Sequence, residues 1–457
     1  MSILTILALV ILSLPIIFLI YGLIQTILEK EKKASILLSI VLSFCLAVIA
    51  ILLIWHDQDV FTYLVCSLAL LFTISCIIIL FPWTEKKLTW ERGKPDQIDE
   101  RNIMFSRAEL APGTERFDSY YKEFPEHKLA DDAFRRHNGF MNEKGTFYNP
   151  WLFGAAEAAF KAVASFHNIT DGPVSNLERE FNPDELTNFI SNWAKELGVH
   201  SIGIAKLEKH HLYHTGGRSH NYGEVVCNSH KYAIAFTVEM DFKRVARAPR
   251  GPIVMESATQ YLNSGSIAVQ IAAFIRNMGY SARAHIDGKY QVRCPEVAKD
   301  AGLGEIGRMG LLMTPKLGPR VRLAVISTDV PLKVSLPRPD KSLLKFCMLC
   351  KKCAETCPSR AISFEDPKET GGTTQWVINQ EACYTYWCKI GTDCGRCMAV
   401  CPYSHPDNLL HNTVRYLIRK SPLFRQIAIR LDNWLYGRKP PEKDLPPWMI
   451  PNSSPPE

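Results

Sequence analysis

The segment FCMLCKKCAETCP at residues 346–358 decides how part of this chain folds, because its cysteines follow the spacing C-x2-C-x2-C-x3-C-P. Three closely spaced thiolates in this pattern bind three irons of one [4Fe-4S] cubane, and the last cysteine crosses to a second cubane. A zinc site needs two C-x2-C pairs with a longer spacer and does not account for the terminal Pro358. The segment therefore predicts an iron-sulfur domain.

A second cysteine run, CGRCMAVCP, lies at residues 394–402. It keeps the C-x2-C-x3-C-P ending but has no cysteine three residues before Cys394, so one ligand must come from elsewhere, and Cys383 and Cys388 are the candidates. Because the last cysteine of each run serves the other cluster, the expected ligands are Cys347, Cys350, Cys353 and Cys401 for one cubane, and Cys383, Cys394, Cys397 and Cys357 for the second. Cys388 is the alternative to Cys383.

Composition limits the class of protein. A chain of 457 residues with 47% hydrophobic residues is long enough for two or three domains. The net charge of +7 is dispersed, without a long Lys/Arg run, so nucleic-acid binding is not predicted. Nine of the 14 cysteines lie between Cys347 and Cys401, which favours metal ligation in a reducing compartment over disulfides. The isolated cysteines are expected to be packing residues: Cys45, Cys66, Cys76, Cys227 and Cys294.

Three apolar stretches open the chain, at residues 3–28, 34–55 and 60–83, and none contains a charged side chain. Each is long enough to cross the roughly 30 Å of a bilayer core as a helix. No basic leader or small-residue cleavage site marks a signal peptide, and no twin-arginine pair precedes the apolar stretches. The sequence predicts three transmembrane helices.

Lysine placement predicts the orientation of these helices, because Lys and Arg stay on the cytoplasmic side. The loop at residues 56–59 has no Lys or Arg, whereas basic residues flank the other ends of the spans: Lys30, Lys32, Lys33, Lys86, Lys87, Arg92 and Lys94. We expect a multi-pass protein of the cytoplasmic membrane with its soluble part on the cytoplasmic side. His56 is interpreted as a solvated loop residue rather than a haem ligand.

The soluble part alternates between helical and strand patterns. Asn182 and Pro183 cap an expected amphipathic helix that closes at Gly198. Short β-prone runs at residues 201–205, 232–238 and 321–327 bracket a further helix at residues 256–278. These patterns predict an α/β sandwich, followed at the end of the chain by an extended, Pro-rich tail from Lys439.

The glycine-dense segment AGLGEIGR at residues 301–308 has the spacing of a dinucleotide-binding turn. Such a turn needs a strand before it and a helix after it, whereas residues 295–300 look helical and the next segment looks like a strand. Close approach of the backbone to a large flat ligand and a purely structural turn both account for the glycines.

Together these motifs resemble the corrinoid-dependent reductive dehalogenases over roughly residues 96–440. The strings that carry the resemblance are DER at 99–101, MFSR at 104–107, YY at 120–121, PE at 125–126, AGLGEIGR at 301–308, TDVPL at 328–332 and FC at 346–347. The resemblance implies an α+β fold in which a nitroreductase-like α/β domain holds base-off cobalamin. Two [4Fe-4S] clusters in a bacterial ferredoxin-like domain would relay electrons to it for removal of halide from an organohalide.

Site residues follow from the same resemblance. The proton-donating tyrosine of the family falls on Tyr261, and its neighbouring arginine falls on Arg320, with Arg322 as an alternative. Asp287 stands where an asparagine commonly lines the pocket, so a carboxyl group here could itself donate or accept a proton. The cofactor is expected at the glycine segment, on Gly302, Gly304, Glu305, Gly307 and Arg308.

The expected layout is a three-helix anchor (1–83), a juxtamembrane segment (84–175), a cobalamin-binding catalytic domain (176–335), a two-cluster domain (336–410) and a C-terminal helical segment with a Pro-rich tail (411–457). Partners would be the membrane lipid, an organohalide, and an electron donor such as a quinol-linked protein, ferredoxin or flavodoxin. In the usual pattern of the family, such an anchor is a separate protein. Here the three apolar stretches lie on the same chain as the catalytic part, so anchor and catalyst are expected to be fused.

Two other functions fit parts of the sequence. An epoxyqueuosine reductase would use the same cofactors, but it is soluble, uses an aspartic acid as its acid and carries a basic helical-repeat tail. The apolar stretches, Tyr261 and the short tail at residues 422–457 argue against it. For a non-catalytic ferredoxin-type electron-transfer subunit, residues 96–340 would be superfluous. Corrinoid content separates this carrier from the two enzymes.

Overall fold

The computed structural model describes residues 3–54, 58–81, 83, 93–176, 179–337 and 339–450. The chain forms two compact units: Met1–Lys87 with His405–Pro440, and Leu88–Ser404 with Pro441–Glu457. The C-terminal helices thus belong to the unit of the apolar helices, although the layout expected from sequence set them apart. Lys86, Lys87, Arg92 and the loop residue His56 lie outside the described residues.

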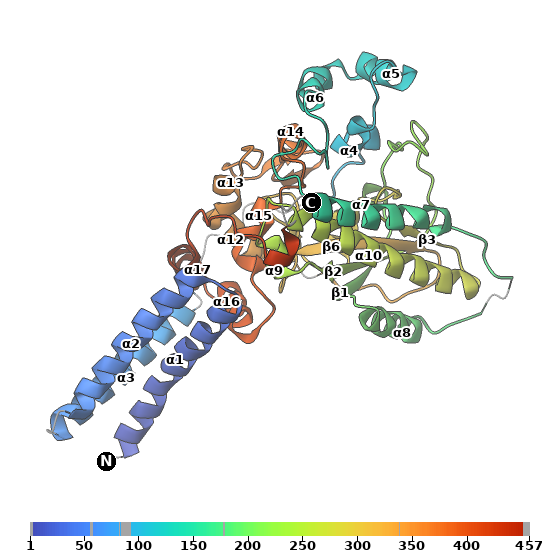
Figure 1. The fold of residues 1–457 in the computed structure, drawn as a ribbon. Helices are drawn as coiled ribbons and strands as arrows, with labels where there is room; N and C mark the ends of the chain where they lie inside the picture. Colours follow the sequence, from blue (N-terminus) through green and yellow to red (C-terminus); the bar gives the residue numbers. More distant parts are fainter. Residues whose placement is uncertain are drawn as a thin grey trace. The chain divides into compact units, whose positions relative to one another are not determined.

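The first unit contains the three expected apolar helices, α1 (Ile3–Leu28), α2 (Lys32–Ile54) and α3 (Gln58–Leu80), which run alongside one another (Figure 1). Three stretches in them, Ile6–Leu28, Lys32–Ile51 and Asp59–Ile79, are long and apolar enough to cross a membrane. Two helices from the other end of the chain complete the unit, α16 (Leu409–Lys420) and α17 (Pro422–Tyr436).

Polar contacts join these C-terminal helices to the ends of the apolar ones. The buried carboxylate of Glu29, just after α1, accepts hydrogen bonds from His411 Nε2 at 2.9 Å and Asn408 Nδ2 at 3.3 Å. The ring of His405 stacks on His411 with centroids 4.5 Å apart. Ser421, the N-cap of α17, donates to the carbonyl of Ile79. Buried polar groups are almost always hydrogen-bonded, because an unpaired one is costly. These contacts therefore fix the helix ends to one another.

We expect acidification to weaken this junction. Burial and the neighbouring His405 lower the pKa of His411 to about 4, although Glu29 opposes the shift. Burial raises the pKa of Glu29, but the hydrogen bond and charge of His411 outweigh it and lower the pKa. An unfolded imidazole binds its proton near pH 6.5, so His411 contributes stability above that pH and loses it as the pH falls towards about 4. Glu29 adds to the loss of stability at lower pH, below the ordinary pKa of a glutamate, because its own pKa is lowered in the folded protein.

The measurement is the thermal unfolding midpoint in detergent between about pH 7 and about pH 5, where the buried imidazole resists protonation. Wild-type protein should lose more of its midpoint over this range than His411→Gln protein, whose side chain does not titrate. Equal slopes for the two proteins would show that His411 does not carry the pH dependence.

The second unit is built on an antiparallel sheet of four strands in the order β1-β2-β6-β3. The strands are β1 (Ser201–Lys206), β2 (Tyr232–Glu239), β6 (Val321–Thr328) and β3 (Ala282–His285). The three strands expected from sequence are confirmed, and β3 is an addition. Side chains of β2 and β6 are buried on both faces of the sheet, which explains their nearly continuous apolar composition.

Helices cover both faces of this sheet, as expected for an α/β sandwich. On one face, α10 (Pro252–Asn277) and α8 (Pro183–Glu196) pack on Ile234 and Phe236 of β2. On the other, α11 (Cys294–Asp300) packs on Ala233 and Ala235 of the same strand. Figure 1 shows α7 (Pro150–Ser165) lying along α10. Asn182 caps α8 with two backbone hydrogen bonds, as its sequence predicts.

Short helices carry the cysteine runs. They are α12 (Lys341–Cys350), α13 (Lys352–Thr356), α14 (Gln380–Ile390) and α15 (Arg396–Ala399). Lys351 and Gly395 stand in the left-handed conformation at φ 53° and 66°, so the chain turns sharply between successive cysteines. The remaining elements are α4 (Met104–Ala108), α5 (Glu115–Glu123), α6 (Lys128–Arg135), α9 (Phe242–Val245), β4 (Glu305–Ile306), β5 (Leu312–Met313), β7 (Lys368–Thr370) and β8 (Thr373–Gln375).

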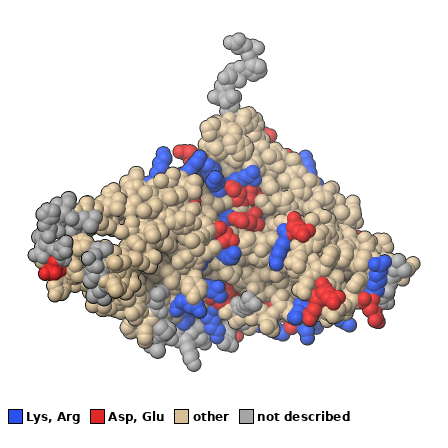
Figure 2. Space-filling view, turned by 90° about the horizontal axis from the view of Figure 1, so that it is seen from below, with Lys and Arg blue, Asp and Glu red and all other residues tan. Residues whose placement is uncertain are grey.

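Charged side chains of both signs are interspersed on the face of the molecule seen in Figure 2. Such mixing is ordinary for a protein surface and gives no large field of one sign on that face.

Candidate functional site

The thiols of the first cysteine run converge with one thiol of the second run. Burial raises the pKa of Cys401 well above its usual value, and the neighbouring thiols of Cys347 and Cys350 raise it further. The same thiols add to the effect of burial on Cys353, whose pKa is raised to about 12. These four cysteines are the set expected from sequence for one cubane. Four thiols gathered at one place are what a cubane requires as ligands.

The second group is built in the same way. Burial raises the pKa of Cys394 to about 12, and Cys383 and Cys357 are its neighbouring thiols. Burial also raises the pKa of Cys397 well above its usual value, again with Cys394 and Cys383 nearby. The backbone N–H of Ala361 donates to Cys357 Sγ at 3.3 Å, a contact that favours a thiolate at this position.

Cys388 lies apart from both groups. It is 2% exposed and packs against Met104 and Phe134. Burial raises its pKa to about 11, and the one side chain that acts on it, Tyr384, opposes the rise through a hydrogen bond and is not a thiol. The structure thus brings Cys383, rather than Cys388, to the thiols of the second group.

A cavity of about 410 Å³ opens beside α10 and the sheet. Ser257 and Tyr261 of α10 line it, together with Asp287 from the turn after β3 and Arg322 from β6. Asp393, which directly precedes Cys394, lines it as well. The cavity therefore meets the chain segment of the second thiol group.

Arg322 is the arginine beside Tyr261. Its guanidinium carbon lies 4.9 Å from the centre of the Tyr261 ring, and Nη2 donates to Ser257 Oγ at 2.5 Å. Asp393 lies 3.4 Å from the same nitrogen. Burial raises the pKa of Tyr261, and the positive charge of Arg322 opposes this effect. The phenol therefore stays protonated until a reacting group takes its proton.

Arg320, the arginine preferred from sequence, points elsewhere. It is fully buried, and its Nη1 pairs with Glu239 at 2.6 Å while Nε donates to the carbonyl of Ser404 at 2.9 Å. It does not belong to the described residues that line the cavity. The sequence alternative, Arg322, takes the place beside Tyr261.

Asp287 lies among charged groups of the cavity. Burial raises the pKa of its carboxyl, and the guanidinium groups of Arg218 and Arg322 partly offset the rise. Arg218 is held by Glu109 at 2.5 Å and lies 3.8 Å from the fully buried Glu100. Burial raises the pKa of Glu100 to about 7. The raised pKa makes the protonated, neutral form of the Asp287 carboxyl more accessible, and that form does not repel an electron-rich substrate.

Aromatic rings form one wall of the cavity. Phe105 lies 6.0 Å from Trp387 between ring centroids, and Trp387 lies 5.7 Å from Phe140. The row continues through Phe160, at 6.4 Å from Phe140, to Tyr261 at 6.3 Å from Phe160. Such a wall suits a flat or halogenated apolar molecule, because it offers polarisable surface and little hydrogen bonding.

Comparison with known proteins agrees with these features. Residues 346–405 match the family model of the 4Fe-4S dicluster domain. A tetrachloroethene reductive dehalogenase from Desulfitobacterium hafniense is 36% identical over 251 residues, which are 52% of this chain and 42% of that protein. Over this part of its length the chain is similar to a reductive dehalogenase. It spans less than half the length of that curated relative.

Solved dehalogenases share the fold. The catabolic reductive dehalogenase NpRdhA, in complex with 3-bromo-4-hydroxybenzoic acid, matches with a TM-score of 0.64 and 24% identity, over 80% of this chain and 53% of that one. A reductive dehalogenase whose structure suggests a mechanism for B12-dependent dehalogenation matches with a TM-score of 0.61 and 24% identity, over 79% and 54%. The mixed helix and sheet fold with a dicluster domain is thereby confirmed.

The glycine segment serves backbone packing. A Cβ atom on Gly304 would lie 2.2 Å from the carbonyl oxygen of Met313, and one on Gly307 would lie 2.6 Å from Met313 Cγ. Gly302 follows α11 with a φ of 79°. Glu305 accepts a hydrogen bond from the backbone of Asp340. Neither these residues nor Arg308, all expected at the cofactor, are among the described residues that line the cavity.

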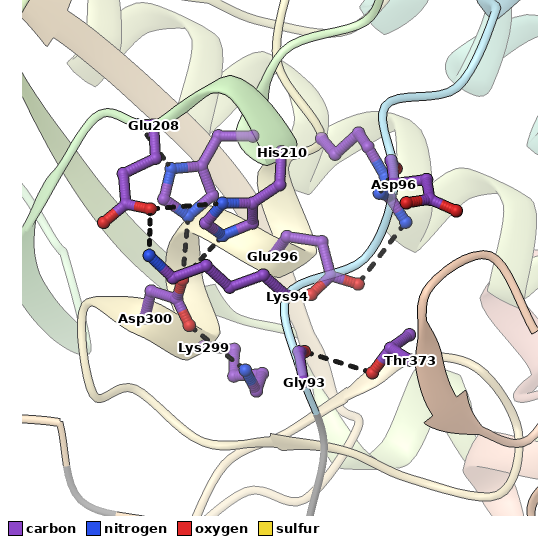
Figure 3. A network of polar contacts seen from close by, with 11 residues as sticks. Gly93, Lys94, Asp96, Glu208, His210, Glu296, Lys299, Asp300 and Thr373 are labelled. Carbon is purple, nitrogen blue, oxygen red and sulfur yellow. Dashed lines mark hydrogen bonds and ion pairs between the residues drawn. The ribbon is translucent and has the colours of Figure 1, made fainter. Parts of the chain in front are cut away.

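A polar cluster near the end of α11 has the composition of a metal site, and its ligand atoms lie within 4.8 Å of one another. Asp300 accepts from Nε2 of both His210 and His211, at 2.9 and 3.0 Å (Figure 3). Nδ1 of His211 already accepts the backbone N–H of Glu208, so the proton of the neutral ring sits on Nε2 and faces Asp300. Figure 3 also shows the ion pairs of Lys94 with Glu208 and of Lys299 with Asp300. The cluster is therefore an ion-pair network that ties the segment after the apolar helices to the sheet.

Sequence reasoning missed several residues of the cavity. Arg218 and Tyr290 form a second arginine–tyrosine pair, with the guanidinium carbon 5.5 Å from the ring centre. Cys294, expected to be a packing residue, lines the cavity, and burial raises its pKa to about 12. The consecutive glycines before Arg218 were the available sequence signal, because they indicate a close approach of two backbone segments. A Cβ atom on Gly217 would lie 2.5 Å from the backbone of Glu100.

Proposed function

We propose that the chain is a membrane-anchored reductive dehalogenase, which removes halide from an organohalide by cobalamin-dependent chemistry with electrons relayed through two [4Fe-4S] clusters. The observation that carries the proposal is the meeting of Tyr261, Arg322 and Asp287 in one cavity whose wall continues into the cysteine domain. The kinship with reductive dehalogenases supports it. The net change is R–X + 2 e⁻ + H⁺ → R–H + X⁻.

The thiols fit two cubanes. Four thiols in each group match the four ligands of a [4Fe-4S] cluster, and each group takes one cysteine from the opposite run, as two-cluster ferredoxins do. We assign Cys347, Cys350, Cys353 and Cys401 to cluster A, and Cys383, Cys394, Cys397 and Cys357 to cluster B. The proximity of Cys353 and Cys394 to the other thiols of their groups supports metal ligation, because a cubane needs four thiolates at one place.

The lining of the cavity does not form a site for a bare metal ion. His285 lines it, but Nε2 contacts Ser327 at 2.8 Å and Nδ1 accepts from Gln291 at 3.1 Å, so neither nitrogen is left for a metal. The groups of three metal-ligating side chains found among the described residues lie elsewhere. Base-off cobalamin would bring its own ring ligands and supply the electrons that break the carbon–halogen bond.

The side chains of the cavity would then manage charge and protons. Tyr261 donates the proton that the carbon takes up, and Arg322 stabilises the phenolate that remains. Asp287, with its raised pKa, is a second acid in the same cavity. The aromatic wall keeps water away from the reacting carbon and holds the substrate against Tyr261.

Halide release tests the proposal directly. Purified protein loaded with cobalamin and iron-sulfur clusters is incubated anaerobically with reduced methyl viologen and a panel of chlorinated and brominated alkenes, phenols and benzoates. Release of halide from at least one compound is expected. A fully loaded protein that releases none, but reduces epoxyqueuosine in tRNA, would favour the epoxyqueuosine reductase alternative. Loading without corrinoid would favour the electron-transfer subunit.

We further propose that the apolar helices anchor the protein with its soluble unit on the cytoplasmic side. Lys30, Lys32 and Lys33 flank α1 and α2 at one end, which supports this orientation. A reporter fused to the C-terminus should therefore fluoresce as a cytoplasmic protein, and an alkaline phosphatase fusion at the same point should be inactive. An active phosphatase would establish the inverse orientation.

A further inference from the structure

Arg308 is a fully buried cation beside the thiols of cluster A. It is 1% exposed, and the groups that act on its charge are, in decreasing order, the thiols of Cys353 and Cys347, the carboxylate of Asp366 and the thiol of Cys350. Burial nevertheless lowers the pKa of its guanidinium. The backbone brings this residue close: a Cβ atom on the preceding Gly307 would lie 3.6 Å from Cys347 Sγ.

The guanidinium of Arg308 is fixed on three sides. Nε donates to the carbonyl of Cys347 at 3.1 Å, and Nη1 donates to the carbonyls of Ser363 at 2.8 Å and Glu365 at 2.7 Å. The ring of Trp376 lies 4.9 Å from the guanidinium carbon. With these contacts the planar group cannot turn without breaking several hydrogen bonds.

One donor of this fixed group lacks a protein acceptor. Nη2 is buried and has no hydrogen-bond partner among the described residues. In a guanidinium, Nε–H and one N–H of Nη2 point from the same edge, so Nη2 faces the side of Cys347. An unsatisfied buried donor is costly, and a bound cubane would supply sulfur acceptors at that place.

We infer that Arg308 donates a hydrogen bond from Nη2 to a sulfur of cluster A and thereby raises the reduction potential of that cluster relative to cluster B. The inference rests on the two-cluster part of the proposed function and not on dehalogenation. Cluster potentials depend on hydrogen bonds to the sulfurs and on nearby charge. A cluster gains negative charge when reduced, so a buried cation and a donor both stabilise its reduced form.

The test is an anaerobic redox titration of the clusters, followed by EPR, on the full-length protein loaded with both clusters. The signal of cluster A is assigned as the one that persists in Cys383→Ala protein. In Arg308→Gln protein the potential of cluster A should fall by about 59 mV or more, which is a tenfold change for a one-electron couple. The potential of cluster B in the same molecules should stay in place. Arg308→Lys, which keeps the charge but loses the fork, should give an intermediate value.

Two controls separate this role from a structural one. Arg360→Gln removes an exposed cation from the same domain and should leave cluster A unshifted, because water screens that charge. Wild-type protein grown with guanidino-¹⁵N arginine should show a ¹⁵N hyperfine coupling on reduced cluster A by pulsed EPR, and Arg308→Lys protein should not.

Several results would overturn the inference. An unchanged potential of cluster A in Arg308→Gln protein with about eight irons, the content of two cubanes, would do so. So would equal shifts of both clusters, or the absence of ¹⁵N coupling in the wild type. A wild-type protein with four irons would instead refute the two-cluster assignment itself.

Discussion

Tyr261→Phe protein is expected to lose about 10²- to 10⁴-fold in dehalogenation turnover, the range of a general acid. The substitution keeps the ring in the aromatic row next to Phe160 and under Arg322, but removes the hydroxyl that donates the proton. The measurement is the steady-state rate of halide release from the best substrate of the panel. The loss of turnover is expected because burial keeps the Tyr261 phenol protonated and Arg322 stabilises the phenolate that proton transfer leaves.

Arg322→Leu protein should also be slow, because the phenolate loses its cation, whereas Glu239→Gln protein should not. Glu239 pairs with Arg320 outside the cavity, so this substitution controls for loss of a nearby ion pair. Corrinoid and iron content must match the wild type in each variant. Full turnover in a fully loaded Tyr261→Phe protein would remove Tyr261 from the mechanism and leave Asp287 as the acid to be tested.

Loss of one ligand of cluster B should reduce the iron content from about eight to about four per protein, because one cubane carries four irons. Cys383→Ala is the variant that tests this, and its reduced EPR spectrum should lack one of the two signals. Cys388→Ala is the matched control. It removes a buried thiol five residues away in the same helix, α14, where the side chain packs on Phe134 rather than facing the thiol group.

The pair of variants discriminates between the two cysteines that sequence spacing leaves open. Eight irons in Cys383→Ala protein, together with four in Cys388→Ala protein, would reverse the assignment. Four irons in the wild type would refute two complete cubanes. Thermal stability should be recorded for both variants, because a cavity left by Cys388 costs some stability without touching the cluster.

The elements predicted best from sequence were those whose pattern is local. The apolar helices, the cap at Asn182 and the strands at residues 201–206, 232–239 and 321–328 depend on hydrophobic periodicity and capping, which a short window of sequence contains. The short strand β3 (Ala282–His285) was missed because four residues carry too little of such a pattern.

The site was harder to predict because it depends on where side chains point. Arg320 and Arg322 are two residues apart, a spacing at which strand side chains share a face. The strand begins only at Val321, after the turn at Pro319, and the turn sends Arg320 to Glu239 instead of the cavity. The glycine segment likewise makes contacts, with Met313 and Cys347, that sequence distance does not reveal.

The division of the chain into two units has a consequence for how the second unit is held to the first. The polypeptide passes between the units at three places, near residues 87, 404 and 440. An anchor attached through one linker is lost after a single proteolytic cut, because nothing else connects the parts. Here residues 88–404 continue into the first unit at both of their ends, near residues 87 and 404, so a single nick does not free them and their release requires cleavage at both junctions.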